Sequence, residues 1–175
     1  MREEYSYSPK PQNKRANVIF YITFVAAIVV YFVSIFIERY KGVVATLAVA
    51  LMATAILFYT KFISASLFYD LVVDGAGESL FVVRQQTGTR QTTLCRVDLE
   101  NVVSVKSLTA AELRAIKPRK NVKRYSYKPT LMPKSVCLIS VENRYETAEI
   151  VIEGDIEFIN TLNSYIALAK AKAEE

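Results

Sequence analysis

Basic side chains are concentrated in one window of this chain. From Arg114 to Lys134 the sequence holds eight cations and no acid, whereas the rest of the chain from Ser64 onward holds seven cations and fourteen acids. Tyr125 and Tyr127 are interleaved with these cations. Each Lys or Arg close to an anionic leaflet is attracted by about 1 kcal/mol. The chemistry that this window predicts is therefore the binding of anionic groups.

Six cations of the window are our candidate ligands for an anionic lipid headgroup. They are Lys117, Arg119, Lys120, Lys123, Arg124 and Lys128. An alternative interpretation is a solvated loop whose charge keeps it soluble or pairs with the acidic remainder of the chain. Nucleic acid is a third option, because polybasic stretches attract phosphate of any kind. No recognisable nucleic-acid module accompanies the window, so nucleic acid is the less favoured partner.

Residue types that carry catalysis are scarce. The chain has no histidine, which removes the commonest general acid and base. Cys95 and Cys137 are too few for a zinc site, and in a reducing compartment we expect them to be inert apolar groups; outside the cell they could form a disulfide. The segment 74–79, DGAGES, lacks the spacing and the lysine of a phosphate-binding loop. We expect no enzyme, no catalytic residue, no metal site and no cofactor.

Acidic residues of the second half are expected on a solvated face. The residues concerned are Asp98, Glu100, Glu146, Glu149 and Glu153.

Two uncharged stretches near the N-terminus predict membrane helices. Residues 16–37 and 42–60 contain no charge. A bilayer core about 30 Å thick needs roughly 20 apolar residues in a helix, so spans over about 16–37 and 42–62 are long enough. The four residues between them predict a tight helical hairpin. The hairpin over 16–65 would thus anchor the chain in the lipid bilayer. No charged residue lies inside either span, so the sequence predicts no ion pathway.

The cations that flank the spans predict the orientation. Lys14 and Arg15 abut the first span, and Lys and Arg are retained on the cytoplasmic side. We therefore expect a multi-pass protein of the cell membrane with both termini cytoplasmic. Five alanines make the second span rich in small residues, which allow helices to approach closely. They are Ala45, Ala48, Ala50, Ala53 and Ala55. Packing within the hairpin is the favoured interpretation, and dimerisation is the alternative.

The polar residues 1–15 are expected to be a flexible tail, and residues 66–175 one cytoplasmic domain. β-branched and aromatic runs predict strands, with turns at 74–78, 87–89 and 143–144. The strands are expected at 69–73, 79–85, 91–97, 102–108, 136–142 and 146–153. Thr109 and Glu112 have the spacing of a capping box. A final amphipathic helix is expected after Asp155, which can cap it.

Two segments resemble bacterial membrane proteins in which a two-helix hairpin precedes a bacterial PH-like (pleckstrin-homology-like) domain. They are CRVDLENVVSVKSL (95–108) and VCLISVENRYETAEIVIEGDIEFINTLNSYI (136–166). The resemblance implies an α+β fold in which a curved antiparallel sheet or barrel is capped by the C-terminal helix. The basic insertion over 109–134 departs from a compact version of that fold.

The expected function is therefore binding or scaffolding at a membrane without catalysis. In this interpretation the PH-like domain engages the anionic membrane surface through the basic insertion. The alternative is a protein–protein interaction module without a lipid role, acting on a protein partner or as a homo-oligomer. A subunit of a small transporter or channel is a third option, which two apolar helices support least.

Overall fold

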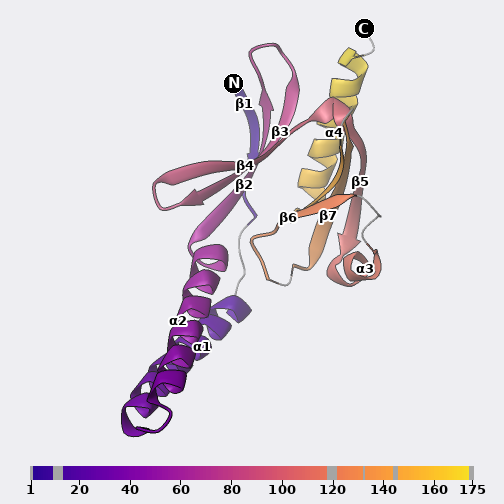
Figure 1. Cartoon of the computed structure of the whole chain (residues 1–175). Coiled ribbons are helices and arrows are strands. Elements are labelled where there is room, and N and C mark those ends of the chain that lie inside the picture. Colours follow the sequence, from indigo (N-terminus) through magenta and orange to yellow (C-terminus); the bar gives the residue numbers. More distant parts are fainter. Residues whose placement is uncertain (1, 10–13, 118–121, 132, 144–145, 174–175) are drawn as a thin grey trace. The chain divides into compact units, whose positions relative to one another are not determined.

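The computed structural model describes residues 2–9, 14–117, 122–131, 133–143 and 146–173 (Figure 1). The chain divides into two compact units, one of residues 11–65 and one of residues 1–10 and 66–175. The elements in chain order are β1 (Arg2–Tyr7), α1 (Lys14–Phe36), α2 (Lys41–Phe62), β2 (Ala65–Val73), β3 (Ser79–Thr87), β4 (Arg90–Asp98), the 3₁₀ turn η1 (Leu99–Asn101), β5 (Val102–Thr109), α3 (Ala110–Ala115), β6 (Lys123–Tyr127), β7 (Ser135–Glu142), β8 (Thr147–Ile152) and α4 (Ile156–Ala173).

The helices α1 and α2 form the first unit, a hairpin. Both are long and apolar enough to cross a membrane, and only 11% of each apolar 18-residue window is buried. Ala27 of α1 and both Ala48 and Ala55 of α2 are buried, whereas Ala50 and Ala53 are exposed. Only some of the small residues of α2 are thus buried.

Two threonines of α2 form hydrogen bonds within their own helix. The Thr46 hydroxyl donates to the Gly42 carbonyl, and the Thr54 hydroxyl donates to the Ala50 carbonyl, each at 2.8 Å. A hydroxyl bonded within its own helix can be placed in lipid at low cost.

The N-terminal segment differs from the expected flexible tail, because it contains strand β1. This strand pairs antiparallel with β2, with Tyr7 opposite Tyr69. Tyr5 and Tyr7 pack against the hydrophobic core, while Glu4 and Ser6 are exposed. The alternation of Tyr with polar residues is the two-residue period of a half-buried strand. The short length of the segment and the prolines that follow it concealed this signal.

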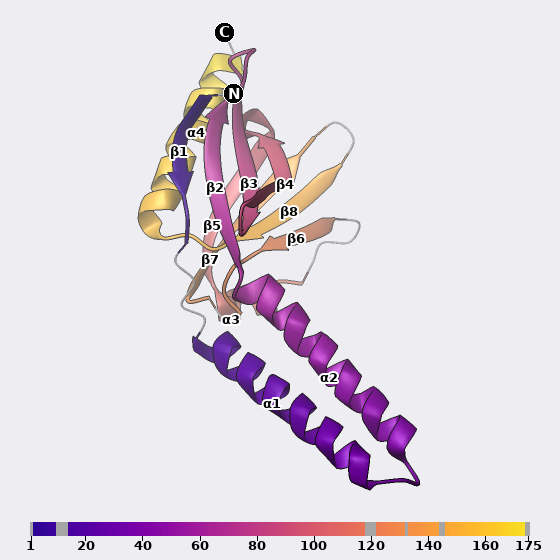
Figure 2. The same ribbon diagram turned by 90° about the vertical axis from the view of Figure 1, so that its left-hand side faces the viewer.

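Two four-stranded sheets form the second unit, with orders β1-β2-β3-β4 and β5-β7-β8-β6 (Figure 2). The sheets do not close into a barrel, so the barrel alternative of the sequence analysis is wrong. The sheets are also not wholly antiparallel, because β6 pairs parallel with β8, from Lys123 opposite Ala148 to Tyr127 opposite Ile152. The residues between β5 and β7 supply this extra strand, which the sequence analysis did not predict.

Helix α4 covers the core of the second unit, as its apolar spacing predicts. Phe158, Leu162 and Ile166 are buried in one cluster with residues of both sheets. The Asp155 carboxylate accepts a hydrogen bond from the Phe158 N–H at 2.8 Å, so the expected cap is confirmed. Gly154 precedes the cap because a Cβ atom there would lie 2.8 Å from Cδ1 of Phe158.

Candidate functional site

The basic insertion is held against the second sheet in its described parts. Thr109 and Glu112 form the expected capping box at the start of α3: the Thr109 hydroxyl accepts from the Glu112 N–H at 3.2 Å, and the Glu112 carboxylate accepts from the Thr109 N–H at 2.7 Å. These bonds lower the pKa of Glu112. Leu113 of α3 then packs against the outer-face cluster that contains Val136 and Val151. The insertion therefore starts as a helix that lies on the sheet.

Arg124 fixes the second half of the insertion to the same sheet. Its Nε and Nη2 atoms both lie 2.7 Å from Oε2 of Glu149, which lies opposite on β8. Its Nη1 donates to the carbonyl of Ile116, just after α3, at 3.1 Å. Glu149 is buried, so its expected position on a solvated face is wrong. The guanidinium joins α3, β6 and β8 through hydrogen bonds of Nε and Nη1, whereas Nη2 is buried within ion-pair distance of Glu149 but makes no hydrogen bond to the described residues, so little of the group is exposed to an external ligand.

The other candidate ligands differ in how far they are engaged. Lys123 forms an ion pair with Glu146 at 3.0 Å, which raises the pKa of Lys123. Lys128 lies close enough to Glu153 for its charge to lower the pKa of that carboxyl, against the larger effect of burial, which raises it. Lys117 is exposed. Arg119 and Lys120 lie outside the described residues. Lipid binding by these six residues stays a prediction.

A network of hydrogen bonds surrounds the side chain of Tyr69 in the core of the domain. Tyr69 is the middle residue of β2, four residues from Ala65 at the start of the strand and four from Val73 at its end. Its hydroxyl donates to the Tyr127 carbonyl at the end of β6, at 2.6 Å, and accepts from the Glu153 N–H just after β8, at 3.3 Å. The end of β1 meets the same point, because Tyr7 lies opposite Tyr69. We call the end of the domain at which β1 ends and β2 begins the connection end.

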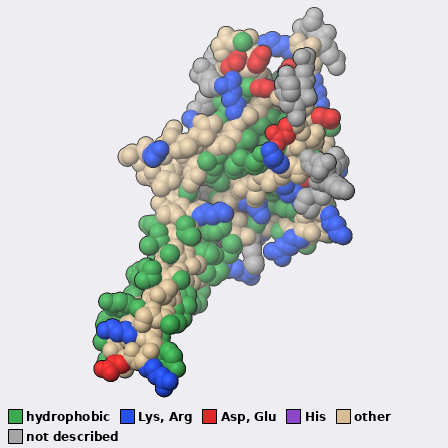
Figure 3. Space-filling view, viewed as in Figure 1, with side chains coloured by type: hydrophobic (Ala, Val, Ile, Leu, Met, Phe, Trp, Pro, Cys, Tyr) green, Lys and Arg blue, Asp and Glu red, His purple; other side chains and the backbone are tan. Residues whose placement is uncertain are grey.

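The start of β7 also belongs to the connection end. Ser135 lies opposite Thr109, where β5 ends and α3 begins, and its hydroxyl donates to the Gly154 carbonyl at 3.1 Å. Lys134 therefore lies near the Tyr69 network, and Arg114 lies on α3, which Figure 2 shows toward the connection end; both residues are exposed. In Figure 3 several Lys and Arg side chains lie on the part of the domain that carries α3, whereas the Asp and Glu side chains lie mainly toward the opposite end, with further Lys and Arg side chains among them.

Most acids of the connection end are engaged inside the domain. The Glu153 carboxylate accepts from the Thr130 N–H at 3.2 Å, and Asp155 caps α4 and lies close enough to the Tyr7 hydroxyl to raise its pKa. Burial and the Asp155 charge raise the pKa of Tyr7 to about 12. Glu112 serves the capping box, and Glu157 is the exposed exception. Arg114, Lys128 and Lys134 thus have no ion pair among the described residues. We call these three residues the basic triad.

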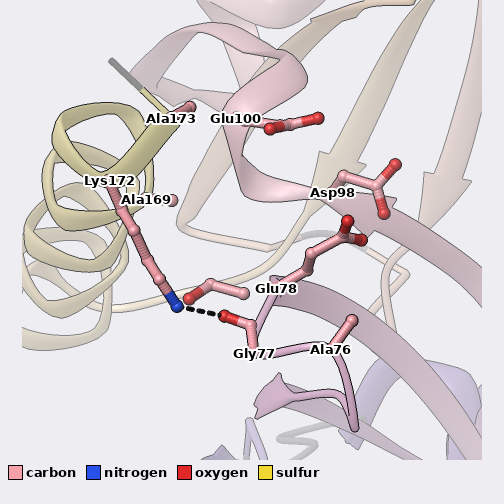
Figure 4. A pocket seen from close by; sticks show the side chains of 9 residues that line it. Ala76, Gly77, Glu78, Asp98, Glu100, Ala169, Lys172 and Ala173 are labelled. Carbon is pink, nitrogen blue, oxygen red and sulfur yellow. Dashed lines mark hydrogen bonds between the residues drawn. The ribbon is translucent and has the colours of Figure 1, made fainter. Parts of the chain in front are cut away.

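A small pocket lies at the opposite end, between the β2–β3 turn, η1 and the C-terminal turn of α4 (Figure 4). Its volume is about 190 Å³, and the carboxylates of Glu78, Asp98 and Glu100 line it. The Lys172 ammonium crosses it to donate to the Gly77 carbonyl at 2.8 Å. Within the described residues no group of three or more His, Cys, Asp or Glu side chains is arranged to hold a metal ion. The pocket is a solvated acidic recess that an ammonium group of the chain itself already occupies in part.

The two cysteines lie on strands of opposite sheets as free thiols. Burial raises the pKa of Cys137 to about 12, and it also raises the pKa of the half-buried Cys95. A thiol with a raised pKa is a poor nucleophile at neutral pH.

Comparisons with protein-family models, with curated proteins and with solved structures found no match to this chain.

Proposed function

We propose that this chain is a membrane-anchored binding protein without catalytic activity. In this proposal α1 and α2 cross the cell membrane as a hairpin, both termini are cytoplasmic, and the β domain engages the anionic surface of the same leaflet. The observation that carries the proposal is the position of the basic triad, at the end of the domain where the chain enters and leaves the hairpin.

The exposed apolar surface of the helices supports the membrane anchor. Large apolar side chains such as Ile22, Val29 and Leu57 are more than half exposed. A core helix of a soluble protein would bury most of this surface. A cleaved signal sequence also fits poorly, because removing α1 would remove β1, which is part of the domain.

The length of the connection supports an electrostatic role for the basic triad. Only Ile63 and Ser64 lie between the end of α2 and the start of β2. The three Cα–Cα steps from Phe62 to Ala65 span at most about 11 Å. The Debye length is about 8 Å at physiological ionic strength, so this link keeps the start of β2 within about two Debye lengths of the end of α2, and cations that the domain turns toward the bilayer would be attracted by the lipid headgroups. Because the domain is tethered, even a few kcal/mol from three cations would bias it toward the surface.

The architecture supports, at a coarser level, the resemblance to PH-like domains. Two stacked sheets and one C-terminal amphipathic helix are shared features. The open sheets and the parallel strand β6 are departures from it. We include a PH-like origin in the proposal on the strength of the element order alone.

A fluorescence experiment on the full-length chain tests the lipid role. A donor dye on an Ala111→Cys variant and an acceptor dye on lipid headgroups would report the distance of α3 from the surface of reconstituted vesicles. We expect energy transfer to increase when phosphatidylglycerol is added to phosphatidylcholine, and to decrease again at high salt. The wild-type chain, treated with the same dye, gives the background energy transfer from labelling of the native thiols.

A matched pair of triple variants makes the test specific. Neutralising the basic triad (Arg114→Gln, Lys128→Gln, Lys134→Gln) should remove the dependence on anionic lipid. Neutralising three cations away from the connection end (Arg96→Gln, Lys106→Gln, Lys170→Gln) removes the same net charge and should preserve it. Equal transfer in neutral and anionic vesicles, or equal loss in both variants, would contradict the lipid role.

Strand β4 supports a second candidate function, protein–protein interaction. It is an edge strand of its sheet, and all of its residues from Arg90 to Leu94 are exposed. An exposed edge strand can accept a strand from a partner. Cross-linking in native membranes should then give a discrete adduct that a Leu94→Lys variant loses. An adduct that forms equally in both would exclude this edge as the contact.

A further inference from the structure

Strand β1 precedes the hairpin in the chain, yet it belongs to the sheet that follows the hairpin. We infer that completion of the β domain is coupled to the topology of the inserted hairpin: β1 cannot reach its place beside β2 when one helix alone crosses the bilayer, and it can when α1 and α2 both cross. The inference rests on the two-span topology proposed above, and goes beyond it by assigning β1 a role in domain assembly. A chain with one inserted helix would carry an open domain.

Hydrogen bonds show what β1 contributes to the sheet. Asp70 on β2 is fully buried, and its carboxylate accepts a hydrogen bond from the Ser6 hydroxyl of β1 at 2.5 Å and another from Nε of Arg84 on β3. Without β1, the carboxylate loses the Ser6 donor on one side. The edge of β2 would also lose its ladder partners from Arg2 to Tyr7. Unpaired strand edges and partly satisfied carboxylates both favour opening or aggregation.

Aromatic contacts join β1 to the core at the same place. The Tyr7 ring stacks on Phe158 of α4 at a centroid distance of 4.6 Å and lies 6.2 Å from the Tyr69 ring. The Tyr5 ring stacks on Phe158 at 6.3 Å. Removing β1 would expose Phe158, which is fully buried in the complete domain. The strand thus covers the most aromatic part of the core.

The bilayer makes this arrangement sensitive to topology. One helix crossing leaves the two ends of that helix separated by a hydrocarbon core about 30 Å thick. A strand attached to one end then lies on the opposite side of the bilayer from a strand attached to the other end. The two cannot pair across the membrane, because an open sheet edge is not tolerated within the hydrocarbon region. Two crossings return the chain to the starting side, and β1 and β2 can then pair.

Deleting one helix from the full-length chain tests the inference. A variant that lacks residues 42–62 keeps every residue of the domain and of β1, but it crosses once. In vesicles under reducing conditions, we expect protease to cleave its domain about tenfold faster or more, since cleavage follows the population of open molecules. A control in which residues 42–60 are replaced by a leucine–alanine helix of equal length should keep the wild-type resistance.

Adding the missing strand tests the cause. A synthetic peptide of residues 2–9, supplied on the side of the domain, should restore protection to the single-span variant, and a peptide with Tyr5 and Tyr7 replaced by Ser should not. A protected domain in the single-span variant, or failure of the peptide to protect it, would overturn the inference.

Reporters fused to both termini separate this inference from the proposed function. Termini of the wild-type chain on opposite sides of the membrane would overturn the two-span topology and the inference with it. Termini on the same side, together with a protected single-span domain, would overturn the inference alone. Energy transfer to anionic lipid is measured separately and does not enter either outcome.

Discussion

The rings of Tyr7 and Phe158 stack at a centroid distance of 4.6 Å, although the whole helical hairpin separates them in the chain. Phe158 is fully buried, and the Tyr7 hydroxyl lies close to Asp155, the residue that caps α4. One side chain of β1 therefore touches both the core and the start of the helix that covers the core. The residues before and after the hairpin fold as one unit.

Shortening Tyr7 should weaken the domain in two separable steps. We expect Tyr7→Ala to lower the free energy of unfolding by about 1–3 kcal/mol, because the half-buried ring loses its contacts with Phe158 and Tyr69. Tyr7→Phe keeps the ring and loses only the polar contact of the hydroxyl with Asp155, so it should cost about 1 kcal/mol at most. Urea unfolding of the full-length protein in detergent measures both. Equal losses in the two variants would show that the ring contacts contribute nothing.

Replacing Gly154 with Ala should disturb the start of α4. The new Cβ would lie 2.8 Å from Cδ1 of Phe158, so this buried ring has to move, at a cost of about 1–3 kcal/mol. Gly75→Ala is the matched control, because nothing lies within 4 Å of a Cβ there. We expect a lower melting temperature for the first variant and little change for the second. A thermally neutral Gly154→Ala variant would mean that Phe158 can relax without loss.

Local patterns predicted most elements of the fold. The uncharged runs predicted both helices of the hairpin, and the observed start of the first helix differs from the predicted start by two residues. The capping signals at Thr109 and Asp155 gave the starts of α3 and α4. Such signals depend on a few residues that are adjacent in the sequence, so they can be recognised without knowledge of the tertiary structure.

Long-range pairing was beyond these patterns. Strand β6 contains the charged residues Lys123 and Arg124, which resemble a solvated loop until Glu149 is placed opposite. Strand β1 is short and becomes regular only beside β2. The candidate site changed for the same reason: Arg124 is bound inside the domain, and Lys134, which the sequence analysis left out of the candidate ligands, is exposed at the connection end.

Replacing Arg124 alone should lower the free energy of unfolding more than replacing both Arg124 and its partner Glu149. Arg124→Ala leaves Glu149, only 4% exposed, as a buried charge without its partner, and breaking such a pair costs about 3–5 kcal/mol. The double variant Arg124→Met, Glu149→Leu removes both charges and should recover much of this loss. Hydrogen exchange over α3 and β6 reports the local effect, and urea unfolding the global one. A double variant no more stable than Arg124→Ala would contradict a buried ion pair at this position.

Glu153 should make the domain less stable as the pH rises above the ordinary pKa of a glutamate. Burial raises its pKa above the ordinary value of 4.5, although the hydrogen bond from the Thr130 N–H and the Lys128 charge act in the opposite sense. The folded state then binds this proton more tightly than the unfolded state. The contribution of Glu153 to the free energy of unfolding therefore falls as pH rises from 4.5 through the raised pKa.

A Glu153→Gln variant tests this sign. The amide oxygen can still accept from the Thr130 N–H, but it does not titrate, so the variant should lose less stability over this pH range and be at least as stable as the wild type at neutral pH.

Glu112 provides the opposite case, because its bonds to Thr109 lower its pKa and its contribution to the free energy of unfolding is lost as pH falls below 4.5. Glu112→Gln should therefore be less stable than the wild type at neutral pH and approach it in acid. Urea unfolding at a series of pH values measures both variants. If the curve for Glu153→Gln runs parallel to that of the wild type, the carboxyl is not desolvated in the folded domain.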